Sequence, residues 1–170
     1  QGNFNSDNCA AGGFTLDYGP FGFMEVFHPY FQPWTGGGEH FSFLNQPVAA
    51  EQNFGSFCSA LSPLLRDDTA AQARLEKIRD GFGTAMQTEM EAMWAAKLGL
   101  GEFDDKLLNQ LLALMVHTPV DYTLLFRTLS DIPDSVEALK LSFYTEADIP
   151  GAAVQPRYSI DAEEMDSLWS

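Results

Sequence analysis

Residues 69–99 read TAAQARLEKIRDGFGTAMQTEMEAMWAAKLG and carry the clearest helical pattern of the chain. Apolar side chains recur along this stretch at the spacing of one helical face, namely Leu75, Ile78, Phe82, Met86, Met90 and Met93. Lys97 and Gly99 supply the cation and the glycine with which helices commonly end. We therefore predict one long helix from Asp68 or Thr69 to Lys97, weakened by about 1 kcal/mol at each of its two internal glycines.

Further helices are expected on both sides of this stretch. Upstream, the pattern predicts a helix from Asn45 to about residue 61, with Asn45 as its cap and Pro47 in its first turn. Downstream, leucine-rich spacing predicts a helix around residues 107–115, and the pattern restarts after Pro119. A shorter helix is expected over residues 134–143. The fold class is thus predicted to be mainly α.

The remaining segments suggest how the chain is organised. Residues 1–46 are rich in Gly, Asn and aromatic residues without a helical period, and Phe14–Leu16 could form a short strand before a turn. This segment forms the small loop/β N-terminal part, and residues 47–145 form a helical lobe. Residues 146–170 mix Pro, Gly and acids, which predicts a weakly ordered acidic tail. A length of 170 residues suits a single domain, and the chain opens with Gln1, so we expect a piece of a larger one.

Charge and cysteine content limit the classes of partner. The chain has 9 Lys+Arg against 24 Asp+Glu, a formal charge of -15, which disfavours nonspecific binding to nucleic acid and to anionic membrane surfaces. No apolar run approaches the roughly 18 to 20 residues of a membrane span. Cys9 and Cys58 are too few for a disulfide framework, so a reducing compartment is the default expectation.

Polar residues near the N-terminus are the candidates for chemistry. Asp7 and Asn8 lie in the run NFNSDNC, and Asp17 follows where the predicted strand turns. This run begins like an EF-hand loop, but the required glycine and the bidentate glutamate are missing. An Asn on a catalytic loop and an Asp at an Asp-aromatic-Gly turn are the magnesium ligands of kinase-type sites. By that pattern Asn8 and Asp17 would bind metal, and Asp7 could act as a general base.

The same three residues have a simpler explanation. Asp and Asn are frequent turn formers and helix caps, so Asp7, Asn8 and Asp17 could serve the loop alone. The His-Arg-Asp pattern of ordinary protein kinases is absent from this segment, which does not support that class.

Several longer motifs resemble one family. GNFNSDN at residues 2–8 resembles the pattern Gly-x-x-Asn-Thr-Asp-Asn, and LDYGPFGF at residues 16–23 matches a second pattern in nearly every letter. FLNQP, AKLGL and DYT at residues 43–47, 96–100 and 121–123 agree as well. On these residues the chain resembles the selenoprotein O (YdiU) family.

The resemblance implies a fold, an activity and a set of site residues. The fold would be the C-terminal lobe of a protein-kinase-like fold, with residues 1–46 as its catalytic-loop and metal-binding segment. The activity would be transfer of AMP from ATP onto Ser, Thr or Tyr hydroxyls of proteins. Asp7 would be the proton acceptor, and Asn8 and Asp17 would bind Mg²⁺ or Mn²⁺, with Asp17 also close to the nucleotide.

The resemblance also indicates what this chain would lack. The family's glycine-rich segment and its phosphate-contacting Lys and Arg residues lie upstream of the catalytic loop, so we expect this chain to hold half of the ATP site. Its relatives occur in bacterial cytoplasm and in mitochondria, which leaves the compartment open. Two alternatives remain, a noncatalytic truncated helical interaction module and kinase-like phosphoryl transfer.

Overall fold

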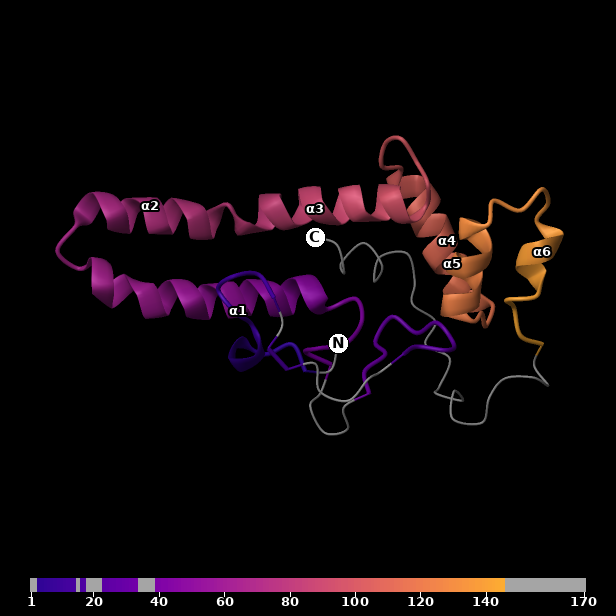
Figure 1. Cartoon of the computed structure of the whole chain (residues 1–170), viewed down its shortest axis with the longest axis horizontal. Helices are drawn as coiled ribbons and strands as arrows, with labels where there is room; N and C mark the ends of the chain where they lie inside the picture. The colour runs from indigo at the N-terminus through magenta and orange to yellow at the C-terminus, as the bar shows by residue number, and fades with distance from the viewer. Residues whose placement is uncertain (1–2, 15, 18–22, 34–38, 146–170) are drawn as a thin grey trace. The chain divides into compact units, whose positions relative to one another are not determined.

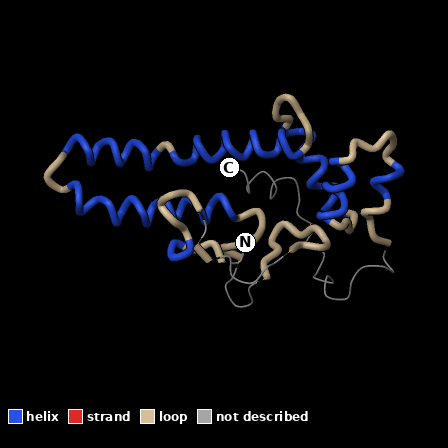
Figure 2. The backbone as a smooth tube through the Cα atoms, viewed as in Figure 1, coloured by secondary structure: helices blue, strands red, loops and turns tan. Residues whose placement is uncertain are grey.

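The computed structural model describes residues 3–14, 16–17, 23–33 and 39–145 (Figure 1). These residues form six α-helices and two short 3-10 helices (Figure 2). Single β-bridges join Val26 with Asp121 and Val120 with Phe143, and no longer strand forms within the described ranges. The prediction of a mainly α fold is therefore confirmed.

The predicted strand at Phe14–Leu16 is not formed at its described residues, Phe14 and Leu16, which belong to no strand. Phe14 accepts a hydrogen bond on its carbonyl from the Ala10 amide at 2.9 Å, and the Leu16 amide donates to the Asn8 carbonyl at 2.7 Å. These two bonds pair the segment with residues 8–10 around a single bridge residue, Cys9, and no longer strand forms there among the described residues. Thr15, the glycines at 36–38 and the predicted tail at 146–170 lie outside the described residues.

The described residues belong to two compact units. One unit takes its residues from 1–22 and 32–91, and the other takes them from 23–31 and 92–170. The division of the chain at residues 46 and 145 expected from the sequence stays a prediction.

The first unit is built on a helical hairpin. α1 (Gln46–Leu61) is followed by a 3-10 helix, η2 (Ser62–Leu65), and by α2 (Thr69–Asp80). Pro47 occupies the first turn of α1 as predicted, but the Asn45 side chain makes no cap bond, and its Nδ2 donates to the Glu39 carbonyl at 2.8 Å. The Asp68 carboxylate caps α2 by accepting from the Ala71 amide at 2.9 Å.

The single long helix predicted for this region is two helices, α2 and α3 (Phe82–Lys97), separated at Gly81. Gly81 keeps a φ of -81°, its amide donates to the Lys77 carbonyl at 3.1 Å, and its carbonyl accepts from the Ala85 amide at 3.1 Å. The interruption is thus confined to one residue. It falls at one of two closely spaced glycines, where helix propensity is lowest.

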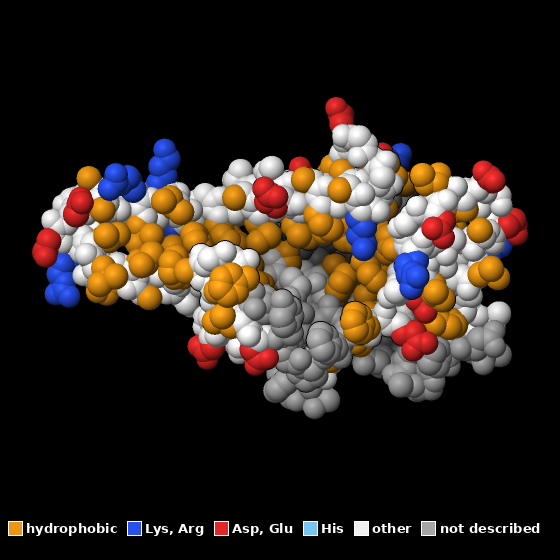
Figure 3. Space-filling model, in the orientation of Figure 1, with side chains coloured by type: hydrophobic (Ala, Val, Ile, Leu, Met, Phe, Trp, Pro, Cys, Tyr) orange, Lys and Arg blue, Asp and Glu red, His pale blue; other side chains and the backbone are white. Residues whose placement is uncertain are grey.

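Packing in the first unit is shallow. Figure 3 shows apolar side chains along the line between α1 and α2, with charged side chains toward the outer edges. Phe54 of α1 stacks on Phe82 at 5.2 Å between ring centroids. Ala49 and Cys58 are buried on α1, whereas α2 has no buried residue. The faces of this hairpin are therefore held mainly by half-buried contacts.

The second unit has the deeper core. It contains the last turns of α3, then α4 (Asp105–His117), α5 (Tyr122–Ser130) and α6 (Glu137–Lys140). Its buried apolar side chains are Met24, Phe27, Trp94, Ala95, Leu108, Leu112, Met115, Val120, Leu125 and Phe126. The buried face of α4 follows the predicted spacing at its core positions. Leu107, expected on the same face, is 41% exposed.

In the second unit, the segment before α5 forms backbone hydrogen bonds with residues 25–27 and with the residues after α6. The Phe27 amide donates to the Val120 carbonyl at 2.9 Å, and the Tyr122 amide donates to the Glu25 carbonyl at 2.8 Å. Beyond α6, the Ser142 carbonyl accepts from the Asp121 amide at 2.7 Å. The hydrogen bond between Asp121 and Ser142 holds residue 142 outside helical geometry. For this reason α6 is shorter than the helix predicted over residues 134–143. Across the described part of the chain, no helix is both long enough and apolar enough to cross a membrane.

Candidate functional site

The candidate catalytic residues lie on a short 3-10 helix, η1 (Ser6–Asn8). The turn is closed by backbone bonds from the Asn8 amide to the Asn5 carbonyl at 3.2 Å and from the Cys9 amide to the Ser6 carbonyl at 3.4 Å. Asp7 is exposed on this turn and Asn8 is half-buried. The carboxylate of Asp7 therefore faces solvent, while the amide of Asn8 is positioned by the loop.

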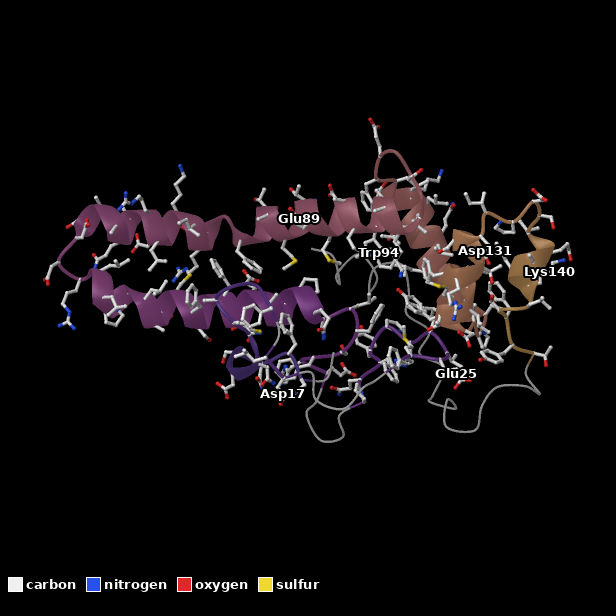
Figure 4. The ribbon with its side chains drawn as sticks, in the orientation of Figure 1. Asp17, Glu25, Glu89, Trp94, Asp131 and Lys140 are labelled. Carbon is white, nitrogen blue, oxygen red and sulfur yellow. The ribbon has the colours of Figure 1, made fainter. Side chains whose placement is uncertain are left out.

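Asn3 links the two predicted metal ligands. Its carbonyl accepts from Nδ2 of Asn8 at 2.9 Å, and its own Nδ2 lies 3.5 Å from the carbonyl of Asp17. The Leu16 amide donates to the Asn8 carbonyl at 2.7 Å, which sets the neighbouring Asp17 beside η1 in the backbone register. The structure thus brings Asp7, Asn8 and Asp17 onto one closed loop. Figure 4 labels Asp17 on this loop.

The side-chain oxygens of Asn8 and Asp17 are of the type that a hard divalent cation prefers. Because Nδ2 of Asn8 donates to the Asn3 carbonyl, Oδ1 is the atom of that amide left to act as a ligand. Asp17 is exposed and adds a carboxylate. Magnesium usually takes one or two protein ligands and completes its shell with water and substrate phosphates, so two such oxygens suffice. No cluster of three or more His, Cys, Asp or Glu side chains occurs among the described residues.

Two residues of this site were not assigned a role from the sequence. Asn3 lies within the GNFNSDN motif, and Asn53 lies in none of the motifs. Nδ2 of Asn53, on α1, donates to the Phe4 carbonyl at 3.0 Å and lies 3.4 Å from Sγ of Cys9. An asparagine within a helix is a poor helix former, and that signal could have marked Asn53.

A second polar cluster, in the other unit, has a structural role. The Tyr144 hydroxyl lies 3.3 Å from both Oε1 of Glu25 and Oδ2 of Asp121. Burial and the two nearby carboxylates raise the pKa of Tyr144 to about 12. The other oxygen of Asp121 accepts from the Leu124 amide at 2.8 Å and caps α5. This cluster therefore ties the start of α5 to segments distant in sequence.

An aromatic group in the same unit surrounds a lysine. Nζ of Lys97 lies 4.1 Å from the ring centroid of Phe126 and 5.2 Å from that of Tyr122. The cation is attracted by the negative faces of both rings. Desolvation lowers the pKa of Lys97, and burial raises the pKa of Tyr122 to about 12. The interaction joins the end of α3 to α5.

The described residues form a mainly helical fold in which one N-terminal loop carries Asp7, Asn8 and Asp17. The family model described as protein adenylyltransferase SelO matches residues 1–151, and the chain belongs to this family. The family assignment made from the motifs is therefore confirmed.

Relatives in several bacteria carry the same name, protein nucleotidyltransferase YdiU. The protein of Xanthomonas campestris pv. campestris strain B100 is 38% identical over 155 residues, covering 86% of this chain and 29% of the relative. That of Nitrosospira multiformis is 37% identical over 139 residues, covering 78% and 24%. That of Flavobacterium johnsoniae is 33% identical over 162 residues, covering 89% and 30%. The chain thus spans less than a third of the length of these relatives, and no solved structure matches it.

Proposed function

We propose that this chain contributes the catalytic loop of a protein adenylyltransferase, which transfers AMP from ATP onto Ser, Thr or Tyr hydroxyls of proteins. Membership of the family and the nucleotidyltransferase names of the relatives support this proposal. The observation that carries it is the closed loop in which Asn3 joins Asn8 and Asp17 beside the exposed Asp7. We further propose that the helices form the C-terminal lobe of a kinase-like fold.

Asp7, Asn8 and Asp17 have distinct roles in the proposed reaction. The acceptor hydroxyl oxygen attacks the α-phosphorus of ATP, the bond to the β-phosphate oxygen breaks, and pyrophosphate leaves. Asp7 accepts the hydroxyl proton, which an exposed carboxylate within reach of the acceptor can do. Asn8 and Asp17 would hold Mg²⁺ or Mn²⁺, and Asp17 would lie close to the nucleotide phosphates. A bound divalent cation offsets negative charge on the phosphates.

Removing the proton acceptor tests this assignment. We expect Asp7→Ala to lower the rate of AMP transfer by about 10²- to 10⁴-fold, the range typical of a lost general base. The measurement is intact-mass spectrometry of a generic protein acceptor incubated with ATP and Mg²⁺ or Mn²⁺. Both the 170-residue chain and the full product of the natural gene are assayed. Asp67→Ala, which removes an exposed carboxylate elsewhere in the same unit, is the matched control.

The adduct mass separates the alternatives. An AMP-sized adduct that Asp7→Ala abolishes and Asp67→Ala retains supports adenylyl transfer. A phosphate-sized adduct would instead indicate kinase-like phosphoryl transfer. No adduct from the folded full-length protein would contradict the proposal and favour a noncatalytic helical interaction module.

A further inference from the structure

The loop that carries Asp7 and Asn8 is fastened to α1 through one side chain. The amide nitrogen of Asn53 reaches the Phe4 carbonyl at 3.0 Å and Sγ of Cys9 at 3.4 Å. Phe4 precedes η1 and Cys9 follows it. Because an asparagine Nδ2 carries two hydrogens, the same group can serve both partners. One residue of the helix therefore holds the two ends of the turn.

A third contact closes this network. Sγ of Cys9 donates to the Asn5 carbonyl at 3.3 Å, so the sulfur links Asn53 to the residue just before η1. Asn53, Cys9 and the backbone of residues 4 and 5 thus enclose the base of the turn. Asn53 is half-buried and lies in the middle of the 16-residue α1, away from the ends where a helix frays.

The contacts extend from Asn53 toward both predicted metal ligands. The Phe4 carbonyl that Asn53 fixes is next in sequence to Asn3, whose carbonyl accepts from Nδ2 of Asn8. Asn3 also reaches the backbone of Asp17. A displacement at Phe4 would therefore move the Asn8 amide, and with it the orientation of Oδ1. Residues that orient a ligand in this way commonly change metal affinity or activity by about 10- to 100-fold when they are replaced.

We propose that Asn53 is a positioning residue that holds the Asp7–Asn8 turn against α1 in the shape needed to bind the cation. This inference rests on the proposed function, because it assigns Asn53 to the same loop. Asn53 touches neither proposed ligand directly. Its effect is transmitted through Phe4, Cys9 and Asn3.

Two isosteric variants of the full gene product test this role. Asn53→Leu keeps the size of the side chain and removes both donors. Asn53→Asp also removes the donors but adds a negative charge, which would strengthen cation binding if proximity alone mattered. The matched control is Asn109→Leu, since Asn109 is a half-buried asparagine in the second turn of α4. The measurements are the Mn²⁺ dissociation constant by electron paramagnetic resonance, kcat and KM for the protein acceptor, and the thermal midpoint.

We expect both Asn53 variants to raise the Mn²⁺ dissociation constant at least about tenfold and to lower kcat by a similar factor. KM for the protein acceptor should stay within about twofold of the control, because the acceptor does not contact Asn53 in this assignment. Asn53→Gln keeps the amide and is expected to restore part of the metal affinity. Weaker binding in Asn53→Asp, despite its added charge, is the result that most directly supports positioning.

Other results overturn the inference. Asn53 variants that match Asn109→Leu in Mn²⁺ binding and kcat would remove any special role for Asn53. Tighter Mn²⁺ binding in Asn53→Asp would show that charge and not positioning governs the site. If the wild type binds Mn²⁺ but transfers no AMP, the proposed function fails while the Mn²⁺ measurement still decides the role of Asn53. A wild type that binds no Mn²⁺ would overturn both.

Discussion

Tyr144 is a single residue whose surroundings make stability depend on pH. Its pKa is raised to about 12, first by burial and then by the carboxylates of Asp121 and Glu25. In the unfolded chain the phenol loses its proton near pH 10, so above that pH the folded state binds more protons than the unfolded state. The protonated Tyr144 phenol therefore makes its full contribution to the free energy of unfolding below pH 10. This contribution is lost as the pH rises toward 12.

We expect the free energy of unfolding to fall between pH 10 and 12, and to fall less steeply in Tyr144→Phe. Tyr122, with its pKa raised in the same direction, contributes to the same window. Lys97 acts in the opposite sense at lower pH, because its lowered pKa makes stability increase with pH up to about 10.5. Urea unfolding at pH 9, 10 and 11 measures the slope. An unchanged slope in Tyr144→Phe would contradict the assignment.

At the level of single residues, the sequence was sufficient for some site positions and not for others. Asp7, Asn8 and Asp17 could be named because their types and order follow a known ligand pattern. Their assignment as base and ligands stays a prediction. Asn53 could not be placed, because it lies 49 positions from Phe4 and no local pattern encodes a contact at that separation.

Gly81, which follows α2, and Gly99, which follows α3, have φ angles of opposite sign. Gly81 has a φ of -81°, and a Cβ placed there would meet the nearest atom, the Lys77 carbonyl oxygen, at 3.4 Å. Gly99 has a φ of +69°, a conformation that residues with a side chain rarely adopt. The Leu100 amide donates back to the Ala95 carbonyl at 2.8 Å, so this conformation ends α3.

We expect Gly81→Ala to stabilise the protein by about 0.5 to 1 kcal/mol, because alanine fits the existing backbone and restricts the unfolded chain. Gly99→Ala is expected to destabilise it by about 1 to 2 kcal/mol, because the residue must stay left-handed. Urea unfolding of both variants measures the two effects, and each variant is the control for the other. A stabilising Gly99→Ala would contradict the proposed end of α3.

Helices were predictable from their apolar spacing, while their interruptions were less so. Residues 45–61 and 107–115 were identified because several apolar residues per helix agree on one face. The separation of α2 from α3 was not predicted. The spacing of apolar residues continues unchanged across Gly81, so it gives no sign of a break of one residue. The shortening of α6 depends on the pairing of Ser142 with Asp121, which lies outside the local pattern.

Burial is uneven across the whole molecule. α4 contributes Leu108, Leu112 and Met115 to the core of its unit, whereas α2 has no buried residue. Helices with few buried contacts open more readily to solvent than those in a packed core. The two compact units are therefore expected to differ in local stability.

We expect the backbone amides of α2 to exchange with deuterium at least about tenfold faster than those in the middle of α4. Hydrogen exchange followed by mass spectrometry on the 170-residue chain measures both helices in one sample. The internal control is α5, which buries Leu125 and Phe126 and should exchange as slowly as α4. Equal protection of α2 and α4 would show that burial does not set local stability here.

The pairing of residues 23–31 with the start of α5 also sets an order of events during synthesis. Phe27 leaves the ribosome before its partner Val120, and at about 5 to 20 residues per second the delay over roughly 90 residues is on the order of 5 to 20 s. The α1–α2 hairpin needs only neighbouring sequence and is available earlier. The segment at 23–31 must therefore wait, with buried residues such as Met24 and Phe27 still uncovered, while the helices on either side of η2 can already pair. In a cell, that interval is when a chaperone would find the nascent chain most accessible.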